Sequence, residues 1–318
     1  MTRRTRVILV FATALAAAAG VVGGAAFLGK DDEPQAARPK GAPPVLVDLG
    51  VRTDPEARLL RNAANLHAHG RRARAQTMFA RGHSLQAQAA EAIAGWPDHS
   101  LERLEELGRE HPRSGAVEFH LGLARFWSGD TNGAVEAWQA TRAGDPDSAF
   151  AVRAADLLFR RFPPGVPTFV PSFQGPSGVR SLDAPEQLAA LKRMARSPDP
   201  RAKLLYGVAL QRIDRPRSAR REFSAAARLA PRSADAQVAD AVGRFDKDHP
   251  ERAFSRLGPL ARRFPKAATV RFHLGLLLLW LGDVDEAKRQ LTRATRLDPP
   301  LSREAKRLLD RLEVVQQR

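Results

Sequence analysis

The sequence predicts an all-α protein, a solenoid of repeated helix hairpins preceded by one transmembrane helix. Three observations predict this fold. The chain of 318 residues is 43% hydrophobic and only 6% aromatic, and it is rich in Ala and Leu, which have high helix propensity. Proline recurs every 34 residues in the C-terminal third, at Pro231, Pro265 and Pro299, and a fixed period of this length is typical of repeat architectures. An uncharged apolar run covers residues 7–28.

The apolar run at the N-terminus predicts a membrane anchor. As a helix, residues 7–28 would extend about 33 Å, enough for the core of a bilayer. Residues 1–6 contain three arginines, whereas three acidic residues follow Lys30. The positive-inside rule therefore predicts a single-pass protein with a cytoplasmic N-terminus and everything after the anchor outside the cytoplasm. A signal peptide that is cut before Phe27 stays open as the alternative.

Residues 29–53 are predicted to form an extended tether, because prolines stand there among charged and small residues with little apolar periodicity. The prolines are Pro34, Pro39, Pro43 and Pro44. Helical order should resume at Asp54-Pro55. An Asp side chain can accept hydrogen bonds from the free amides of a first turn, and proline is tolerated at the first helical position.

Three tandem units, 200–233, 234–267 and 268–301, repeat one pattern of small and bulky residues. Two helices of a hairpin must approach closely at the eighth and twentieth positions, which are small. The eighth position is Gly207, Ala241 and Gly275, and the twentieth is Ala219, Ala253 and Ala287. The twenty-fourth position is bulky, and it is Phe223, Leu257 and Leu291.

The same pattern recurs upstream. Unit 115–148 contains Gly122, Ala134, Trp138 and Pro146, a degenerate unit begins near residue 81, and Gly70, Ala75 and Phe79 mark a first hairpin. These spacings resemble the tetratricopeptide repeat family, whose units are small at positions eight and twenty, bulky at twenty-four, and carry proline at thirty-two. The resemblance implies a right-handed superhelical solenoid over residues 54–301. Residues 302–318, with Leu308, Leu309 and Leu312, should form a helix that caps its open end.

An insertion at residues 163–182 interrupts the repeats, between a helix expected near 148–162 and a second expected near 184–196. It is rich in proline and carries Phe169 and Phe173, whose even spacing puts both rings on one side of an extended chain. Two interpretations stay open. The insertion is either a surface loop whose rings pack on the solenoid, or a docking segment for a partner or for the groove of this chain.

The sequence contains no pattern that predicts catalysis, a cofactor or a metal site. It has no Cys and no glycine-rich phosphate loop, and no Ser stands near an obvious base. His67 and His69 face opposite sides of a helix, which disfavours a shared metal. His120 and His273 recur at the sixth position of their repeats and are interpreted as ordinary polar positions on a helix surface. The protein is therefore not expected to be an enzyme.

The resemblance implies a concave groove lined by positions two, five, nine, twelve and thirteen of each first helix. The candidate groove residues are Phe119, Leu123, Phe126, Trp127, Arg201, Arg212, Val242, Phe245, Phe272, Leu276 and Trp280. The face is apolar and aromatic with a basic interruption. Trp127 and Trp280 both occupy position thirteen and are expected at the rim of the groove. That these apolar residues are buried between neighbouring hairpins stays open as the alternative.

These features predict a membrane-anchored scaffold that captures an extended or helical segment of another envelope protein. A second hypothesis uses the net charge of +16 and the run Arg212, Arg215, Arg217, Arg220 and Arg221, which would bind an anionic polymer or acidic lipid. A third is an accessory subunit of an envelope enzyme complex. Nucleic acid is not expected as a partner, because the repeats are predicted to lie outside the cytoplasm.

Overall fold

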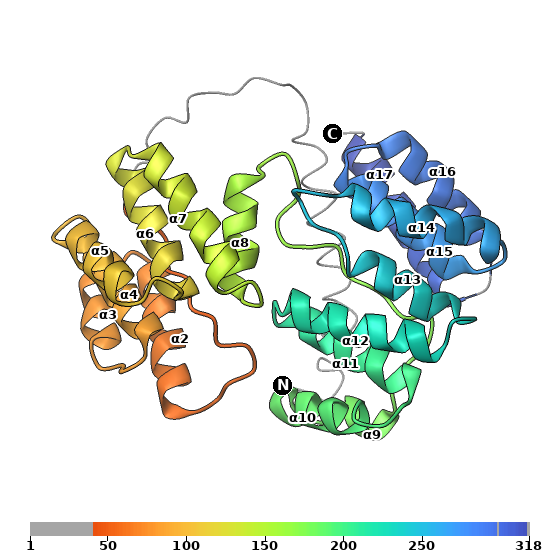
Figure 1. The fold of residues 1–318 in the computed structure, drawn as a ribbon, viewed down its shortest axis with the longest axis horizontal. Helices are drawn as coiled ribbons and strands as arrows, with labels where there is room; N and C mark the ends of the chain where they lie inside the picture. Colours follow the sequence, from red (N-terminus) through yellow and green to blue (C-terminus); the bar gives the residue numbers. More distant parts are fainter. Residues whose placement is uncertain (1–40, 298, 317–318) are drawn as a thin grey trace. The chain divides into compact units, whose positions relative to one another are not determined.

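The computed structural model describes residues 41–297 and 299–316, with side chains to residue 313, and all of its regular structure there is helical (Figure 1). The described chain forms two compact units, one that ends at Leu158 and one that begins at Phe159. Within these residues we find no helix that combines the length and the apolar character needed to cross a membrane. The predicted cytoplasmic residues 1–6 and transmembrane segment 7–28 lie outside the described residues.

The N-terminal unit consists of helices that pack on their neighbours in the sequence. They are α2 (Pro55–Ala68), α3 (Arg72–Phe79), α4 (Leu85–Ala94), α5 (Ser100–Glu110), α6 (Gly115–Ser128), α7 (Thr131–Gly144) and α8 (Ala149–Leu158). The predicted start of the first hairpin is confirmed. The Asp54 carboxylate accepts a hydrogen bond of 3.0 Å from the amide of Ala57, and Pro55 is the first helical residue.

The C-terminal unit continues the same pairing of consecutive helices. They are α9 (Ser177–Arg180), α10 (Ala184–Met194), α11 (Pro200–Arg212), α12 (Pro216–Leu229), α13 (Ala234–Val242), α14 (Glu251–Arg263), α15 (Ala268–Trp280), α16 (Val284–Thr295) and α17 (Leu301–Gln316). The predicted capping helix is α17, which packs on α15 and α16 and buries Leu308 and Leu312.

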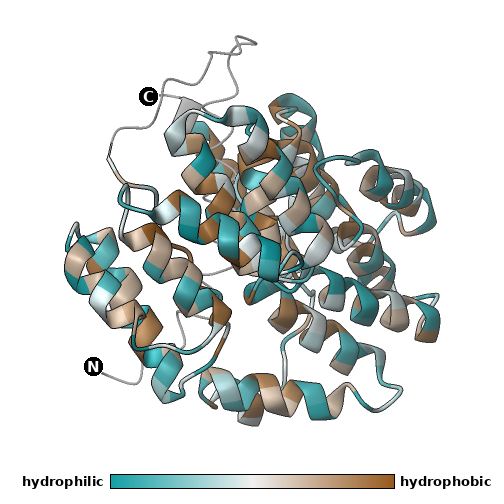
Figure 2. Cartoon of the chain, turned by 60° about the vertical axis from the view of Figure 1, so that its left-hand side comes forward, coloured by the Kyte–Doolittle hydropathy of each residue, from teal (hydrophilic) through white to brown (hydrophobic). Residues whose placement is uncertain are grey.

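The repeat positions explain how the hairpins close. A methyl group added at Gly122 of α6 would collide with the ring of Trp138 of α7, and one added at Gly275 would lie 2.7 Å from Leu291 Cγ. The residues at position twenty are buried alanines, and those at position twenty-four are buried bulky residues. The predicted packing of small against bulky positions is confirmed, and Figure 2 shows the resulting division of helices into hydrophobic and hydrophilic sides.

The division into two units differs from the single solenoid that the sequence predicts over residues 54–301. The helix expected to reach residue 162 ends at Leu158, and the helix expected to pair with it, α10, belongs to the other unit. The cause is the insertion, which is non-helical except for the single turn of α9 (Figure 1). The right-handed superhelical path stays a prediction.

Candidate functional site

Each unit holds an extended segment of its own chain against the first helices of its hairpins. In the N-terminal unit this is residues 43–49, the N-terminal segment, on a surface of α4, α6 and α8 that we call the N-terminal groove. In the C-terminal unit it is residues 167–173, the insert segment, on a surface of α11, α13 and α15 that we call the C-terminal groove.

The main chain of the N-terminal segment is bound by two side chains at the sixth position of successive repeats. The amide of Leu46 donates to His120 Nε2 at 3.2 Å, and the amide of Asp48 donates to Gln86 Oε1 at 3.0 Å. The Asp48 carboxylate accepts a hydrogen bond of 3.0 Å from the amide of Ala149 at the first turn of α8. A helix N-terminus favours a negative charge at this place.

Apolar side chains complete the contact of the N-terminal segment. Val45 and Leu46 pack on the core shared by α4 to α8, whereas Val47 and Leu49 pack on the core of α2 to α4. An open hollow of about 560 Å³ remains beside the segment, between Asp48, Gln86 and Phe150.

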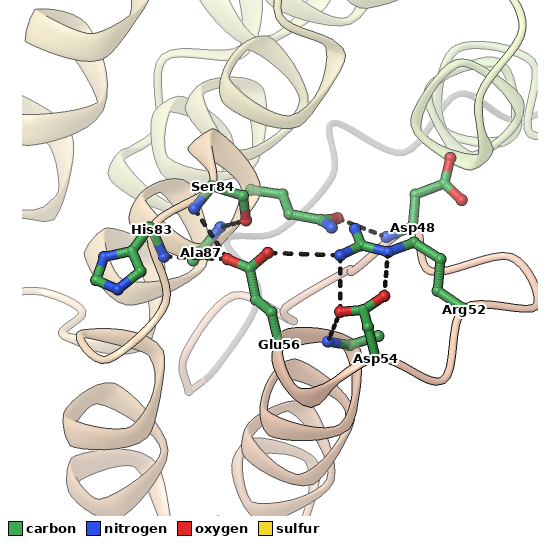
Figure 3. A network of polar contacts seen from close by, with 9 residues as sticks. Asp48, Arg52, Asp54, Glu56, His83, Ser84 and Ala87 are labelled. Atoms are coloured by element: carbon green, nitrogen blue, oxygen red, sulfur yellow. Dashed lines mark hydrogen bonds and ion pairs between the residues drawn. The ribbon is translucent and has the colours of Figure 1, made fainter.

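The chain beyond Leu49 is fastened by the polar network in Figure 3. Arg52 pairs with Asp54 at 2.8 Å, and Glu56 Oε1 accepts from the amides of His83 and Ser84 at 3.0 and 2.9 Å. The hydrogen bond from Ser84 is the main cause that lowers the pKa of Glu56. The tether predicted over residues 29–53 is thus corrected from residue 43 onward, because its apolar residues find partners in the folded unit.

The main chain of the insert segment is bound by one side chain at the sixth repeat position, His273, and by Gln211 at the twelfth position of unit 200–233. The amide of Val170 donates to His273 Nε2 at 2.9 Å, and the amide of Phe169 donates to Gln211 Oε1 at 3.0 Å. The amide group of Gln211 also donates to the carbonyl of Pro167 at 3.4 Å. The Ser172 hydroxyl donates a hydrogen bond to the Asp235 carboxylate.

The two phenylalanines of the insertion lie on the helices of their own unit. The ring of Phe169 is 2% exposed, stacks on His273 with centroids 5.1 Å apart, and meets the edge of Phe223. Phe173 is half-buried, and the Arg201 guanidinium lies 5.2 Å from its ring centroid. Whether either ring serves a partner stays a prediction.

A buried lysine holds the chain just before the insert segment. Lys247 donates to the carbonyl of Pro163 at 2.8 Å, and its ammonium lies 5.7 Å from the ring centroid of Trp280. Phe162 meets Phe245 edge-on, and Phe245 in turn packs on Trp280. Trp280 is only 2% exposed, so its expected place at a rim is wrong. It belongs to the buried cluster formed by α15, α16 and α17.

The other candidate groove residues divide by exposure. Arg201 and Arg212 are exposed, and Trp127 and Phe245 are half-buried. The buried residues are Phe119, Leu123, Phe126, Val242, Phe272 and Leu276. These apolar side chains form the cores on which the segments rest, and their role toward a partner stays a prediction.

His120 and His273 were also misplaced by sequence reasoning. Both are fully buried, and neither is an ordinary surface position. Burial lowers the pKa of each to about 4, opposed by the hydrogen bond to a backbone carbonyl. Nδ1 lies 2.7 Å from that carbonyl, of Ala116 and Thr269 respectively. The neutral ring therefore donates from Nδ1, and the Nε2 lone pair accepts the amide of the segment.

Sequence reasoning also missed Gln86, Asp235 and Lys247. Gln211 is position twelve of unit 200–233, one of the positions expected to line the groove, and it does bind the insert segment. For the histidines, the signal in the sequence was their recurrence at the sixth repeat position. In the part of the chain that the structure describes, no cluster of three or more His, Asp or Glu residues is placed to hold a metal.

The arginine run near α12 is partly engaged in local contacts. Arg215 donates to the carbonyl of Ile213 at 2.8 Å, and Arg221 donates to the Ser218 hydroxyl at 2.7 Å. Burial and the neighbouring guanidinium of Arg244 lower the pKa of Arg220, although Asp240 opposes this effect.

No family model matches the chain, and no curated protein matches it. Similar solved structures include a tetratricopeptide repeat protein from Parabacteroides merdae, which is 12% identical, covers 81% of this chain and 98% of its own, and has a TM-score of 0.34. Yeast Tom70 is 13% identical, with coverages of 93% and 70% and a TM-score of 0.31. The TPR2AB domain of yeast Sti1 in complex with pHSP90 is 11% identical, with coverages of 81% and 98% and a TM-score of 0.30. These TM-scores are low, and the architecture is therefore established by the helix hairpins of the chain itself.

Proposed function

We propose that the protein is a non-enzymatic scaffold that captures an extended segment of another protein in its grooves. In this proposal residues 7–28 hold it at the membrane, with both units outside the cytoplasm. One observation carries the proposal. Both units accept an extended chain by giving acceptors to its main-chain amides and apolar surface to its side chains.

An extended partner fits these grooves better than a helical one. In a helix the main-chain amides are already used, whereas His120, His273, Gln86 and Gln211 accept main-chain amides. Main-chain hydrogen bonds supply affinity in recognition of this kind, and side-chain contacts supply specificity.

The segments of the chain itself must leave before a partner binds. A tethered segment competes at an effective concentration on the order of millimolar. The intact chain should therefore bind partners more weakly than a chain whose segment has lost its contacts.

Affinity capture tests this proposal. The full chain in membranes is compared with a variant whose residues 167–173 are replaced by seven Gly and Ser residues, and retained proteins are identified by mass spectrometry. The matched control replaces the exposed residues 176–178 by Gly and Ser. We expect the first variant alone to retain more partner, and a synthetic peptide of residues 163–174 to release it. Equal retention by all three proteins would contradict the proposal.

A second candidate function uses the arginine run. The guanidiniums of Arg217, Arg244 and Arg252 all act on Arg220 with like charge, which a polyanion or an acidic lipid surface would relieve. Its test is the dependence of binding on salt.

A further inference from the structure

The two segments carry the same residue pattern when they are aligned on the amide that a position-six histidine accepts. Leu46 then corresponds to Val170. The alignment pairs Pro43 with Pro167, Val45 with Phe169, Asp48 with Ser172 and Leu49 with Phe173. The shared pattern is Pro-x-apolar-apolar-x-(Asp/Ser)-apolar.

Paired residues also have similar packing partners, although Val45 is half-buried and Phe169 is fully buried. Pro43 and Pro167 are both buried. Val45 and Phe169 each pack against the helical core of their unit. Leu49 packs on the core of α2 to α4, and Phe173 lies beside Arg201 of α11, so each is on an earlier hairpin than the histidine that binds Leu46 or Val170. The pattern therefore reflects common contacts and not composition alone.

The two segments also run in the same direction along the helices of their grooves. In the N-terminal unit the chain passes from His120, in the middle of α6, to Gln86 and Ala149 in the first turns of α4 and α8. In the C-terminal unit it passes from Gln211, near the C-terminal end of α11, to Arg201 in the first turn of the same helix. Each segment thus runs toward the N-terminal ends of the helices that bind it.

The sixth residue of the pattern distinguishes the two grooves. In the N-terminal groove Asp48 accepts from the amide of Ala149, so a carboxylate is favoured by the helix N-terminus. In the C-terminal groove the facing group is the Asp235 carboxylate, which takes a hydroxyl donor from Ser172. A second carboxylate there would be repelled.

We propose that the partner of these grooves is an extended protein segment with the pattern Pro-x-apolar-apolar-x-(Asp/Ser)-apolar, with Asp selecting the N-terminal groove and Ser the C-terminal groove. This inference rests on the proposed function, because it specifies the segment that is captured. The fourth residue of the pattern must not be proline, since its amide is donated to the histidine.

The test uses fluorescent peptides of residues 41–50 and 163–174 with two variants of the full chain. In one variant residues 167–173 are replaced by Gly and Ser, and in the other residues 43–49 are replaced. Circular dichroism and thermal unfolding establish that each variant is folded. If a replacement unfolds the chain, the double substitution Phe169→Ala and Val170→Ala, or Val45→Ala and Leu46→Ala, serves instead.

Anisotropy titrations should show that each vacated groove binds its own peptide at least tenfold more tightly than the intact chain does. In the 163–174 peptide, Ser172→Asp should weaken binding to the C-terminal groove at least tenfold, and Asp235→Asn in the protein should restore it. An N-methyl group at Val170 should abolish binding. An N-methyl group at Thr168, whose amide is not the one donated to Gln211 or His273, is the matched control.

The outcomes separate this inference from the proposed function. Binding of motif and scrambled peptides with equal affinity would overturn the pattern and leave groove capture standing. Absence of any peptide binding to the folded variants would overturn both. If sedimentation shows that the vacated variants dimerise, and the peptides dissociate these dimers, the occupant is a second copy of this chain. The proposal that another protein fills the grooves would then be overturned.

Discussion

The N-terminal and C-terminal units hold their segments by the same acceptors but to different depths. The N-terminal segment presents aliphatic side chains that are mostly half-buried, beside an open hollow of about 560 Å³. The insert segment buries the ring of Phe169 between His273 and Phe223, and Lys247 holds the chain ahead of it. One mode of main-chain recognition thus supports both a loosely held and a tightly held segment, and we expect the N-terminal groove to be the easier one to vacate.

The largest expected effect is on the free energy of unfolding, and it compares how deeply the two segments are buried. Phe169→Ala removes a fully buried ring, and we expect it to lower the free energy of unfolding by about 3 to 5 kcal/mol. Val45→Ala at the corresponding, half-buried position should cost about 1 kcal/mol. Denaturant unfolding of both variants checks the contrast, and equal losses would contradict the difference in depth.

The next effect is acid destabilisation of both grooves. The histidines have an ordinary pKa of 6.5, lowered to about 4 in the folded chain. Since the folded pKa is the lower one, the stabilisation is fully present above pH 6.5 and is lost as the pH falls through 4. The loss should approach about 3 kcal/mol for each histidine.

Unfolding measured between pH 7 and pH 4 checks this dependence. The variant His273→Gln should lose the part that comes from the C-terminal groove and keep the part from His120. If the pH dependence of the unfolding free energy is the same in this variant as in the parent chain, burial does not lower the pKa of His273 as the account predicts.

A smaller effect on stability distinguishes the loss of the hydrogen-bond acceptor from the loss of the imidazole ring. His273→Leu leaves the amide of Val170 without a partner and should cost about 1 to 3 kcal/mol. His273→Gln should cost less, because a Gln side chain can also accept a main-chain amide at the sixth repeat position, as Gln86 does from Asp48 in the other unit. The same pair of substitutions at His120 tests the N-terminal groove. Denaturant unfolding gives the differences, and an equal loss for Leu and Gln would argue against a specific acceptor role.

The smallest effect concerns the arginine run. Replacing Arg217, Arg220 and Arg221 by Gln should change stability by less than about 1 kcal/mol for each residue, since charges near the surface contribute little. If the run is a binding surface, association of the intact chain with anionic vesicles should fall steeply with salt. Binding that is equal in the Gln variant, or independent of salt, would remove this alternative.

The repeat hairpins could be predicted from the sequence because their packing is encoded locally. Small residues such as Gly275 and bulky ones such as Leu291 stand at fixed separations, and the helices close wherever they meet. The helix N-cap at Asp54 could be predicted equally well, because it depends on residues within one helical turn.

The contacts of the segments could not be predicted in this way. They join residues that are far apart in sequence, such as Val170 with His273, and no local period connects them. The prolines near residue 43 indicated a tether, whereas the apolar residues from Val45 to Leu49 bind a surface that only the folded unit creates. The recurrence of histidine at position six was visible, but its meaning depended on the chain that lies opposite.

The most direct test of the account is the hydrogen bond between the insert segment and the C-terminal groove. Nuclear magnetic resonance of the ¹⁵N-labelled full chain can detect the coupling across this bond, between the amide nitrogen of Val170 and His273 Nε2, which lie 2.9 Å apart. The account predicts a measurable coupling at pH 7, with Nε2 unprotonated. No coupling, together with an Nε2 that carries a proton, would contradict the claim that the groove is filled by an extended segment of the chain itself.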